Sequence, residues 1–213
     1  PLSHEHERAV ELLRAAIDAA VGDTTLALLP SLRCFLDTSS NESAELHRLL
    51  QIDDDVDHDQ LKFSLFTHLG GLNAKVASFP LQVLDAALIN AAKVVDGMCA
   101  LALYSGDFPR GKETKLYSSI NTAMRAHEGN EESACTIDQG ILIVGLTLPF
   151  IDGVQWMLRD VLPRMRQITF RGIGYELDKP RIGSVYPQAC FGSTSIDKVQ
   201  AWRYARRCML LML

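Results

Sequence analysis

Apolar residues recur at three- and four-residue steps through most of the chain, which is the period of an amphipathic α-helix. The first such repeat runs through Val10, Leu13, Ile17 and Ala20, and Ser3 stands where a helix cap belongs. The strict alternation of apolar and polar residues that marks a half-buried strand is scarce. The pattern therefore predicts an all-α fold, a compact domain of many helices.

Caps, glycines and prolines divide this pattern into separate helices. Two capping boxes, Asp57–Gln60 and Thr136–Gln139, place a short acceptor three residues before a glutamine. Three of the predicted helices after the first have both ends marked, at 41–50, 81–105 and 112–127. Another begins at Asp57 and ends at Gly70-Gly71, and one lies between Pro149 and Pro163. Two more begin after Thr136 and near Ser195. Residues 172–194 hold six glycines and prolines and are predicted to form a long irregular segment.

The segment Leu81–Ser105 is predicted to be the longest helix and to lie at the centre of the fold. Its polar residues Gln82, Asp85, Lys93 and Asp96 fall within about 80° of arc, and the rest of its surface is apolar or small. We expect the core to contain Leu84, Leu88, Val95, Cys99, Leu142, Trp156 and Leu162.

Charge is distributed unevenly along the chain, although the whole carries a formal net charge of only −5. Residues 1–60 hold thirteen acidic and four basic residues, a net of −9, and residues 158–213 hold ten basic and four acidic residues, a net of +6. This predicts either a single domain, 1–213, or an acidic helical lobe, 1–105, joined to a basic helical lobe, 106–213. A polarised molecule of this kind suits an anionic partner or head-to-tail self-association.

Length and composition are typical of a soluble globular protein, with 213 residues of which 47% are hydrophobic. The five cysteines are widely spaced and are predicted to be reduced, buried thiols. We find no signal-peptide pattern, and the longest uncharged stretch in the middle of the chain, between Asp138 and Asp152, is shorter than the about 20 residues of a membrane span. The expected location is intracellular, cytoplasmic or nuclear, without a transmembrane segment.

Four aspartates alternate at Asp53, Asp55, Asp57 and Asp59, as calcium-loop ligands do. An EF-hand loop beginning at Asp53 would need glycine at its sixth position and glutamate at its twelfth, where this chain has His58 and Ser64. The run is also similar to the aspartate-rich magnesium site of terpene-type synthases, but we find no second metal motif. The favoured interpretation is a solvated turn and helix cap. The alternative is an all-α, metal-dependent enzyme that acts on a phosphorylated small molecule.

Other possible catalytic motifs are excluded by their neighbouring residues or by the secondary structure predicted around them. The segment Gly106–Lys112 has the spacing of a phosphate loop, but Glu113 replaces the Ser or Thr that reaches magnesium, and a helix precedes it instead of a strand. The six histidines do not form a ligand set, and no activated nucleophile is evident. The sequence therefore predicts no catalytic residue, no metal site and no cofactor.

The basic C-terminal third carries the main functional hypothesis. Arginine guanidinium groups neutralise phosphates, and aromatic rings stack on unpaired bases, so basic residues interleaved with Tyr and Trp favour single-stranded nucleic acid. The predicted contact residues are Arg164, Arg166, Arg171, Lys198, Trp202, Arg203, Arg206 and Arg207. The alternative is that these side chains pair with the acidic N-terminal lobe.

The chain ends in an uncharged, apolar tail, Cys208–Leu213. We expect it to pack on its own domain as the end of a C-terminal helix, or on a second copy as an assembly arm. Taken together, these features predict a non-enzymatic, self-associating structural protein that binds single-stranded RNA or another polyanion. By analogy of composition it is similar to a viral nucleoprotein, coat or matrix component. The competing hypotheses are the metal-dependent enzyme and a protein-interaction adaptor.

Overall fold

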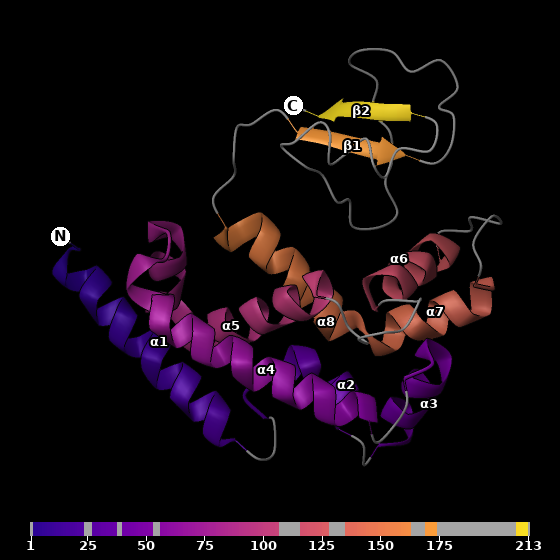
Figure 1. The fold of residues 1–213 in the computed structure, drawn as a ribbon, viewed down its shortest axis with the longest axis horizontal. Coiled ribbons are helices and arrows are strands. Elements are labelled where there is room, and N and C mark those ends of the chain that lie inside the picture. Colours follow the sequence, from indigo (N-terminus) through magenta and orange to yellow (C-terminus); the bar gives the residue numbers. More distant parts are fainter. Residues whose placement is uncertain are drawn as a thin grey trace. The chain divides into compact units, whose positions relative to one another are not determined.

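The computed structural model divides the chain into two units, Pro1–Pro163 and Arg164–Leu213 (Figure 1). The structure describes residues 2–23, 27–37, 40–52, 56–106, 116–127, 135–162, 169–173 and 208–212. The division falls after Pro163, and helices from residues 1–105 and from residues 106–163 pack together in the first unit. In particular, α5 (Leu81–Ser105) contacts α6 (Leu116–His127) and α8 (Leu148–Trp156).

All the regular secondary structure described in the first unit is helical, which confirms the predicted all-α class. Its other α-helices are α1 (His4–Gly22), α2 (Arg33–Leu36), α3 (Asn41–Leu50), α4 (Val56–Lys75) and α7 (Ile137–Leu146). Three short non-α turns accompany them, the 3₁₀-helices η1 (Pro30–Leu32) and η2 (Val76–Ser78) and the π-helical turn η3 (Met157–Val161).

The second unit contains the exception to the helical class, an antiparallel pair of short strands. Strand β1 (Thr169–Ile173) pairs with β2 (Cys208–Met212), so that Thr169 lies opposite Met212 and Ile173 opposite Cys208. The prediction that the tail ends a C-terminal helix is therefore wrong. An apolar run of five residues fits a strand as well as a helix, and its partner lies far away in sequence. The remainder of the predicted irregular segment 172–194, and the helix start near Ser195, lie outside the described residues.

Helix α1 forms as its sequence predicts. The Ser3 hydroxyl accepts a hydrogen bond from the His6 backbone N–H at 3.2 Å, which caps the helix. Its predicted apolar face is buried against α5. The His6 ring also lies within hydrogen-bond distance of the Asp85 carboxylate of α5, 3.0 Å from Nε2 to Oδ1.

Helix α4 differs from its prediction at both ends. It begins at Val56, which places Asp57 inside the first turn and not at the cap. It also continues through Gly70-Gly71 to Lys75, where the sequence predicts a stop. Each helical glycine costs about 1 kcal/mol. Leu69 and Leu72 are buried on either side of the pair, and this packing keeps the helix intact.

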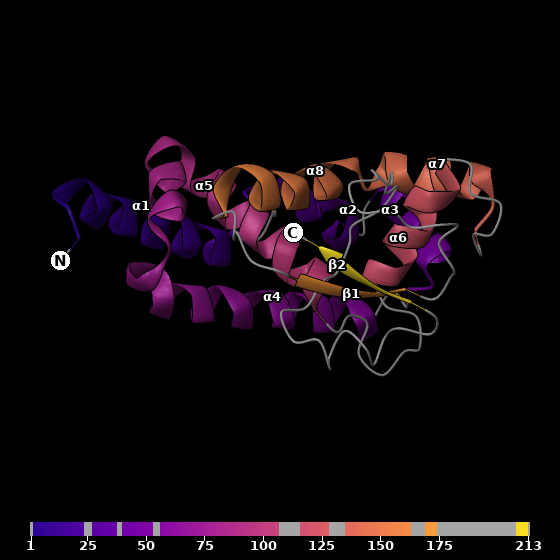
Figure 2. The ribbon, with the colours of Figure 1, turned by 90° about the horizontal axis from the view of Figure 1, so that it is seen from above.

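Helix α5 runs through the centre of the first unit, as predicted. Figure 2 shows α4 and α8 on opposite sides of it, and both contact it. The predicted core residues Leu84, Val95 and Cys99 are fully buried. Leu88, Trp156 and Leu162 are only half-buried, and Leu142 is 41% exposed, because α7 buries Gly140 and Ile143 instead.

By length and apolar character alone, α5 could cross a membrane. Helix α7 and Leu148–Val161, which are bent by 66° relative to each other, would also qualify if they counted as one span. No other helix among the described ranges meets these criteria. Core helices of soluble proteins meet the same criteria, and α5 supplies much of the buried core here. The absence of a transmembrane segment therefore stays a prediction.

The predicted capping box at Thr136 is confirmed and fixes the start of α7 beside α6. The Gln139 N–H donates to Thr136 Oγ1 at 3.2 Å, and the Thr136 N–H donates to Gln139 Oε1 at 3.1 Å. Gly140 then lies directly against α6, where a Cβ atom would stand 2.8 Å from the Ala123 carbonyl oxygen and 2.8 Å from Ala126 Cβ. A glycine is therefore required for this helix pair to approach.

We expect Gly140→Ala to lower the free energy of unfolding by about 1–3 kcal/mol, because the added methyl group forces α6 and α7 apart. Gly145→Ala in the same helix is the matched control, since a Cβ there would meet no atom within 4 Å. It should leave stability unchanged or raise it by up to about 1 kcal/mol. Urea denaturation followed by far-UV circular dichroism measures both. Equal stability of the two variants would contradict the close approach.

Candidate functional site

The predicted nucleic-acid residues lie in the second unit, and one of them falls in a described element. Arg171 stands in β1 and pairs with Leu210 of β2 in the ladder. The others lie outside the described residues: Arg164, Arg166, Lys198, Trp202, Arg203, Arg206 and Arg207. Their role in binding stays a prediction.

The acidic and glycine-rich motifs gain no support as sites. Asp53–Asp55 lie outside the described ranges, as do residues 107–112 of the segment with phosphate-loop spacing. Gly106, the first residue of that segment, ends a helix. Within the part of the chain that the structure describes, no three His, Cys, Asp or Glu side chains are placed to hold a metal ion.

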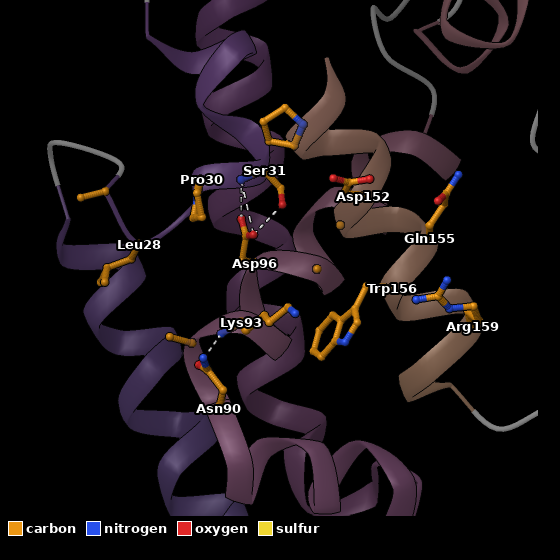
Figure 3. Close-up of a pocket in the computed structure, with 15 residues that line it drawn as sticks. Leu28, Pro30, Ser31, Asn90, Lys93, Asp96, Asp152, Gln155, Trp156 and Arg159 are labelled. Atoms are coloured by element: carbon orange, nitrogen blue, oxygen red, sulfur yellow. Dashed lines mark hydrogen bonds between the residues drawn. The ribbon is translucent and has the colours of Figure 1, made fainter. Parts of the chain in front are cut away.

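A groove of about 650 Å³ lies between α5 and α8 in the first unit (Figure 3). We call it the α5–α8 groove. It is lined by Ala27, Leu28, Pro30 and Ser31 from the η1 region, by Asn90, Ala92, Lys93, Asp96 and Gly97 from α5, and by Pro149, Asp152, Gly153, Gln155, Trp156 and Arg159 from α8 and η3.

A buried carboxylate joins η1 to α5 at one side of the groove. Asp96 is only 5% exposed, and it accepts hydrogen bonds from the Ser31 hydroxyl at 2.6 Å and from the Ser31 backbone N–H at 3.1 Å (Figure 3). Burial raises the pKa of Asp96, and the two bonds from Ser31 lower it by less. The Asp96 oxygens are therefore held by the protein itself.

Two glycines let α8 lie close to α5 and so shape the base of the groove. A Cβ on Gly97 would lie 2.6 Å from Met157 Cγ and 3.3 Å from the Trp156 ring. A Cβ on Gly153 would lie 2.5 Å from Ser31 Oγ. Any side chain at either position would displace the residues that line the groove.

The other side of the groove begins at a break in α5. Asn90 has non-helical backbone angles, φ −157° and ψ 88°, and its side-chain oxygen accepts from the Lys93 N–H at 3.0 Å. Asn90 thus caps a second helical segment, which continues to Ser105. Lys93 lies in the first turn of this segment, and its ammonium nitrogen stands 4.3 Å from the centroid of the Trp156 ring.

A smaller cavity of about 220 Å³ lies between α4 and α5, and its apolar lining includes four leucines and Ala102. Its polar lining includes Gln60 and His68, and the atoms Gln60 Oε1 and His68 Nε2 are buried without a hydrogen-bond partner. Burial lowers the pKa of His68, and a hydrogen bond to the Met98 backbone opposes this by less. Burial also raises the pKa of the Cys99 thiol, which makes it unreactive.

The α5–α8 groove is equipped for binding more than for bond-breaking. Its one hydroxyl, that of Ser31, is buried and donates to Asp96. Its exposed polar groups are the ammonium of Lys93, the amides of Asn90 and Gln155, the carboxylate of Asp152 and the guanidinium of Arg159, and the Trp156 ring beside them is half-buried. Arg159 already pairs with Asp160 at 2.9 Å. Such a set can bind and orient a small polar molecule.

No protein family, no curated protein and no solved structure matches this chain.

Sequence reasoning missed this groove. The sequence places Lys93 and Asp96 on one narrow polar arc of α5, whereas in the structure Asp96 is buried and the exposed Lys93 lies over an aromatic ring. The available signal was Asn90, a polar residue and poor helix former within a long apolar helix. It marked the break, although nothing in the sequence indicated which segments would meet there.

We expect the stability difference between the wild-type protein and Asp96→Asn to depend on pH. Because the pKa of Asp96 is raised in the folded state, the folded protein keeps a proton that the unfolded chain has released. The wild-type protein should therefore lose stability relative to Asp96→Asn as the pH rises from about 4, the ordinary aspartate value, through the raised pKa. Urea denaturation at a series of pH values measures this difference.

Ser31→Ala provides the control for this experiment. Removing the hydroxyl removes one of the bonds that lower the pKa of Asp96, so the pH-dependent window should extend to higher pH. A difference between wild type and Asp96→Asn that stays constant across these pH values would contradict a buried, titrating carboxyl group.

Proposed function

We propose that this protein binds single-stranded nucleic acid, or another polyanion, through its second unit and self-associates as a non-enzymatic structural protein. The observation that carries the proposal is the coincidence of two boundaries. The chain divides into units at Pro163, and its charge changes sign at the same place.

The charges of the two units support binding by the second unit alone. Arg164–Leu213 holds nine basic and three acidic residues, a net of +6 within 50 residues. Pro1–Pro163 holds twelve basic and twenty-three acidic residues, a net of −11. A polyanion is attracted by the second unit and repelled by the first, so the contacts fall on one part of the chain.

The strand pairing of the second unit supports the proposal in another way. Strand β1 carries Arg171, and β2 directly follows Arg206 and Arg207 in the sequence. The ladder thus joins the two ends of the basic third through backbone hydrogen bonds. Tyr175, Tyr186, Phe191, Trp202 and Tyr204 lie between these ends in sequence and could supply rings for base stacking.

Self-association is the second part of the proposal. The apolar tail, one of whose two predicted roles is an assembly arm, forms a strand with its own chain in this structure. Assembly through the tail would then exchange β2 between copies, which is a common route to dimers. Light scattering of Cys208–Leu213 deletion and full-length proteins measures this directly, and equal masses would exclude the tail as the arm.

Binding to single-stranded RNA should weaken log-linearly with salt concentration. Each phosphate contact contributes about −0.7 to the slope of log K against log salt for a single strand. Arg203→Ala with Arg207→Ala should therefore flatten the slope by about 1.4, whatever the RNA sequence. Trp202→Ala should lower the affinity by about 1–3 kcal/mol with little change in slope, because stacking releases no counterions. Fluorescence anisotropy with labelled RNA measures both quantities.

The matched control is Arg8→Ala with Arg14→Ala, which removes two exposed arginines from α1 in the acidic unit. This variant should leave the slope unchanged. Absence of RNA binding at low salt would overturn the proposal. If the Arg203 and Arg207 variant were also less stable than the wild type, the arginines would be structural partners of acidic residues instead.

A further inference from the structure

We propose that the α5–α8 groove is a binding site for a small phosphomonoester of the nucleoside monophosphate class. This site lies within the first unit and does not depend on nucleic-acid binding by the second. The volume of about 650 Å³ lies within the range of small-molecule pockets, about 300–1,000 Å³.

The anion-binding part of the site is the start of the second segment of α5. The break at Asn90 brings the positive end of a helix of fifteen residues, Ala91–Ser105, to the groove. Lys93 adds a full positive charge in the first turn of that segment. Its ammonium group contacts the Trp156 ring and has no carboxylate within ion-pair distance among the residues that the structure describes. A phosphate can therefore be bound there without displacing an existing ion pair.

Two carboxylates line the groove, those of Asp96 and Asp152, and they differ in how strongly they would repel a phosphate bound at Lys93. The Asp96 carboxylate lines the groove, but it is buried and accepts hydrogen bonds from the Ser31 hydroxyl and backbone N–H. Asp152 is exposed on the α8 side, where Figure 3 shows its carboxylate near Ser31 and away from Lys93. An exposed carboxylate away from the phosphate can accept hydrogen bonds from the ribose hydroxyls. The site thus favours an anion that also carries hydroxyl groups.

The remaining lining is apolar and suits a flat ring. Leu28, Pro30 and Pro149 line the groove, and all three are exposed. A nucleobase would cover these apolar groups, which a free phosphate or a small sugar phosphate would leave in water. This is why a nucleoside monophosphate fits the groove better than either.

The cation–π contact supplies a direct readout. An anion that binds Lys93 changes the environment of the Trp156 ring beside it. The chain has two tryptophans, so Trp202→Phe leaves Trp156 as the single tryptophan. Titration of this full-length variant with AMP should give a saturable change in fluorescence with a Kd below about 1 mM. Adenosine and inorganic phosphate should each bind about tenfold more weakly or worse, because each lacks one half of the contacts.

Lys93→Gln tests the proposed contact between Lys93 and the phosphate. Because this substitution also changes the surroundings of Trp156, the affinity of the variant is measured by calorimetry and not by fluorescence. The Lys93 side chain is exposed, so the variant should fold, which its melting temperature verifies. It should bind AMP about tenfold more weakly or worse. Lys75→Gln, at an exposed position at the end of α4, is the control and should bind as the wild type does.

Four outcomes would overturn the proposal. These are the absence of saturable binding of AMP, equal affinity for adenosine and AMP, equal affinity for inorganic phosphate and AMP, and unchanged affinity of the folded Lys93→Gln variant. The third would show that the groove holds an anion without selecting a nucleoside.

Discussion

The hydrogen bonds from Ser31 to Asp96 hold a buried carboxylate at the centre of the first unit. A carboxylate on a buried face of the central helix is costly unless donors satisfy it. Ser31 supplies two donors, its hydroxyl and its backbone N–H, from a segment 65 residues away. This requirement fixes η1 against α5, and α8 then packs on both of them. The fold thus depends on one polar contact at the point where three segments meet.

The groove is a consequence of the same arrangement. Gly97 and Gly153 allow α8 to approach α5 and η1 so closely that no Cβ would fit at either position. Asn90 breaks α5 seven residues before Gly97, so the two parts of that helix cannot both follow α8. A straight α5 would present one continuous ridge to its neighbours. The broken helix leaves a hollow instead and turns the start of its second segment, with Lys93, toward it (Figure 3).

Much of the helical fold could be predicted from the sequence, because its determinants are local. Ser3 and Thr136 cap their helices as predicted, and the apolar period of α1 matches its buried face. The errors arise where distant segments decide the outcome. Helix α4 continues through Gly70-Gly71 because Leu69 and Leu72, on either side of the pair, are buried. The apolar tail is a strand because it pairs with β1. Asp96 can be buried because Ser31 donates hydrogen bonds to it. Ser31 lies 65 residues away, so the local sequence around Asp96 does not indicate this partner. The groove could not be predicted for the same reason.

The charge of the two units also determines what kind of anion each can accept. A long polyanion samples the field of a whole surface, and a first unit of net charge −11 opposes it. A small anion responds mainly to the groups within a Debye length, about 8 Å at physiological ionic strength. In the α5–α8 groove those groups include Lys93 and the positive end of a helix, while the buried Asp96 is already engaged. Under the two proposals, the acidic unit would bind a mononucleotide while its charge repels a strand, and the basic unit would bind the strand.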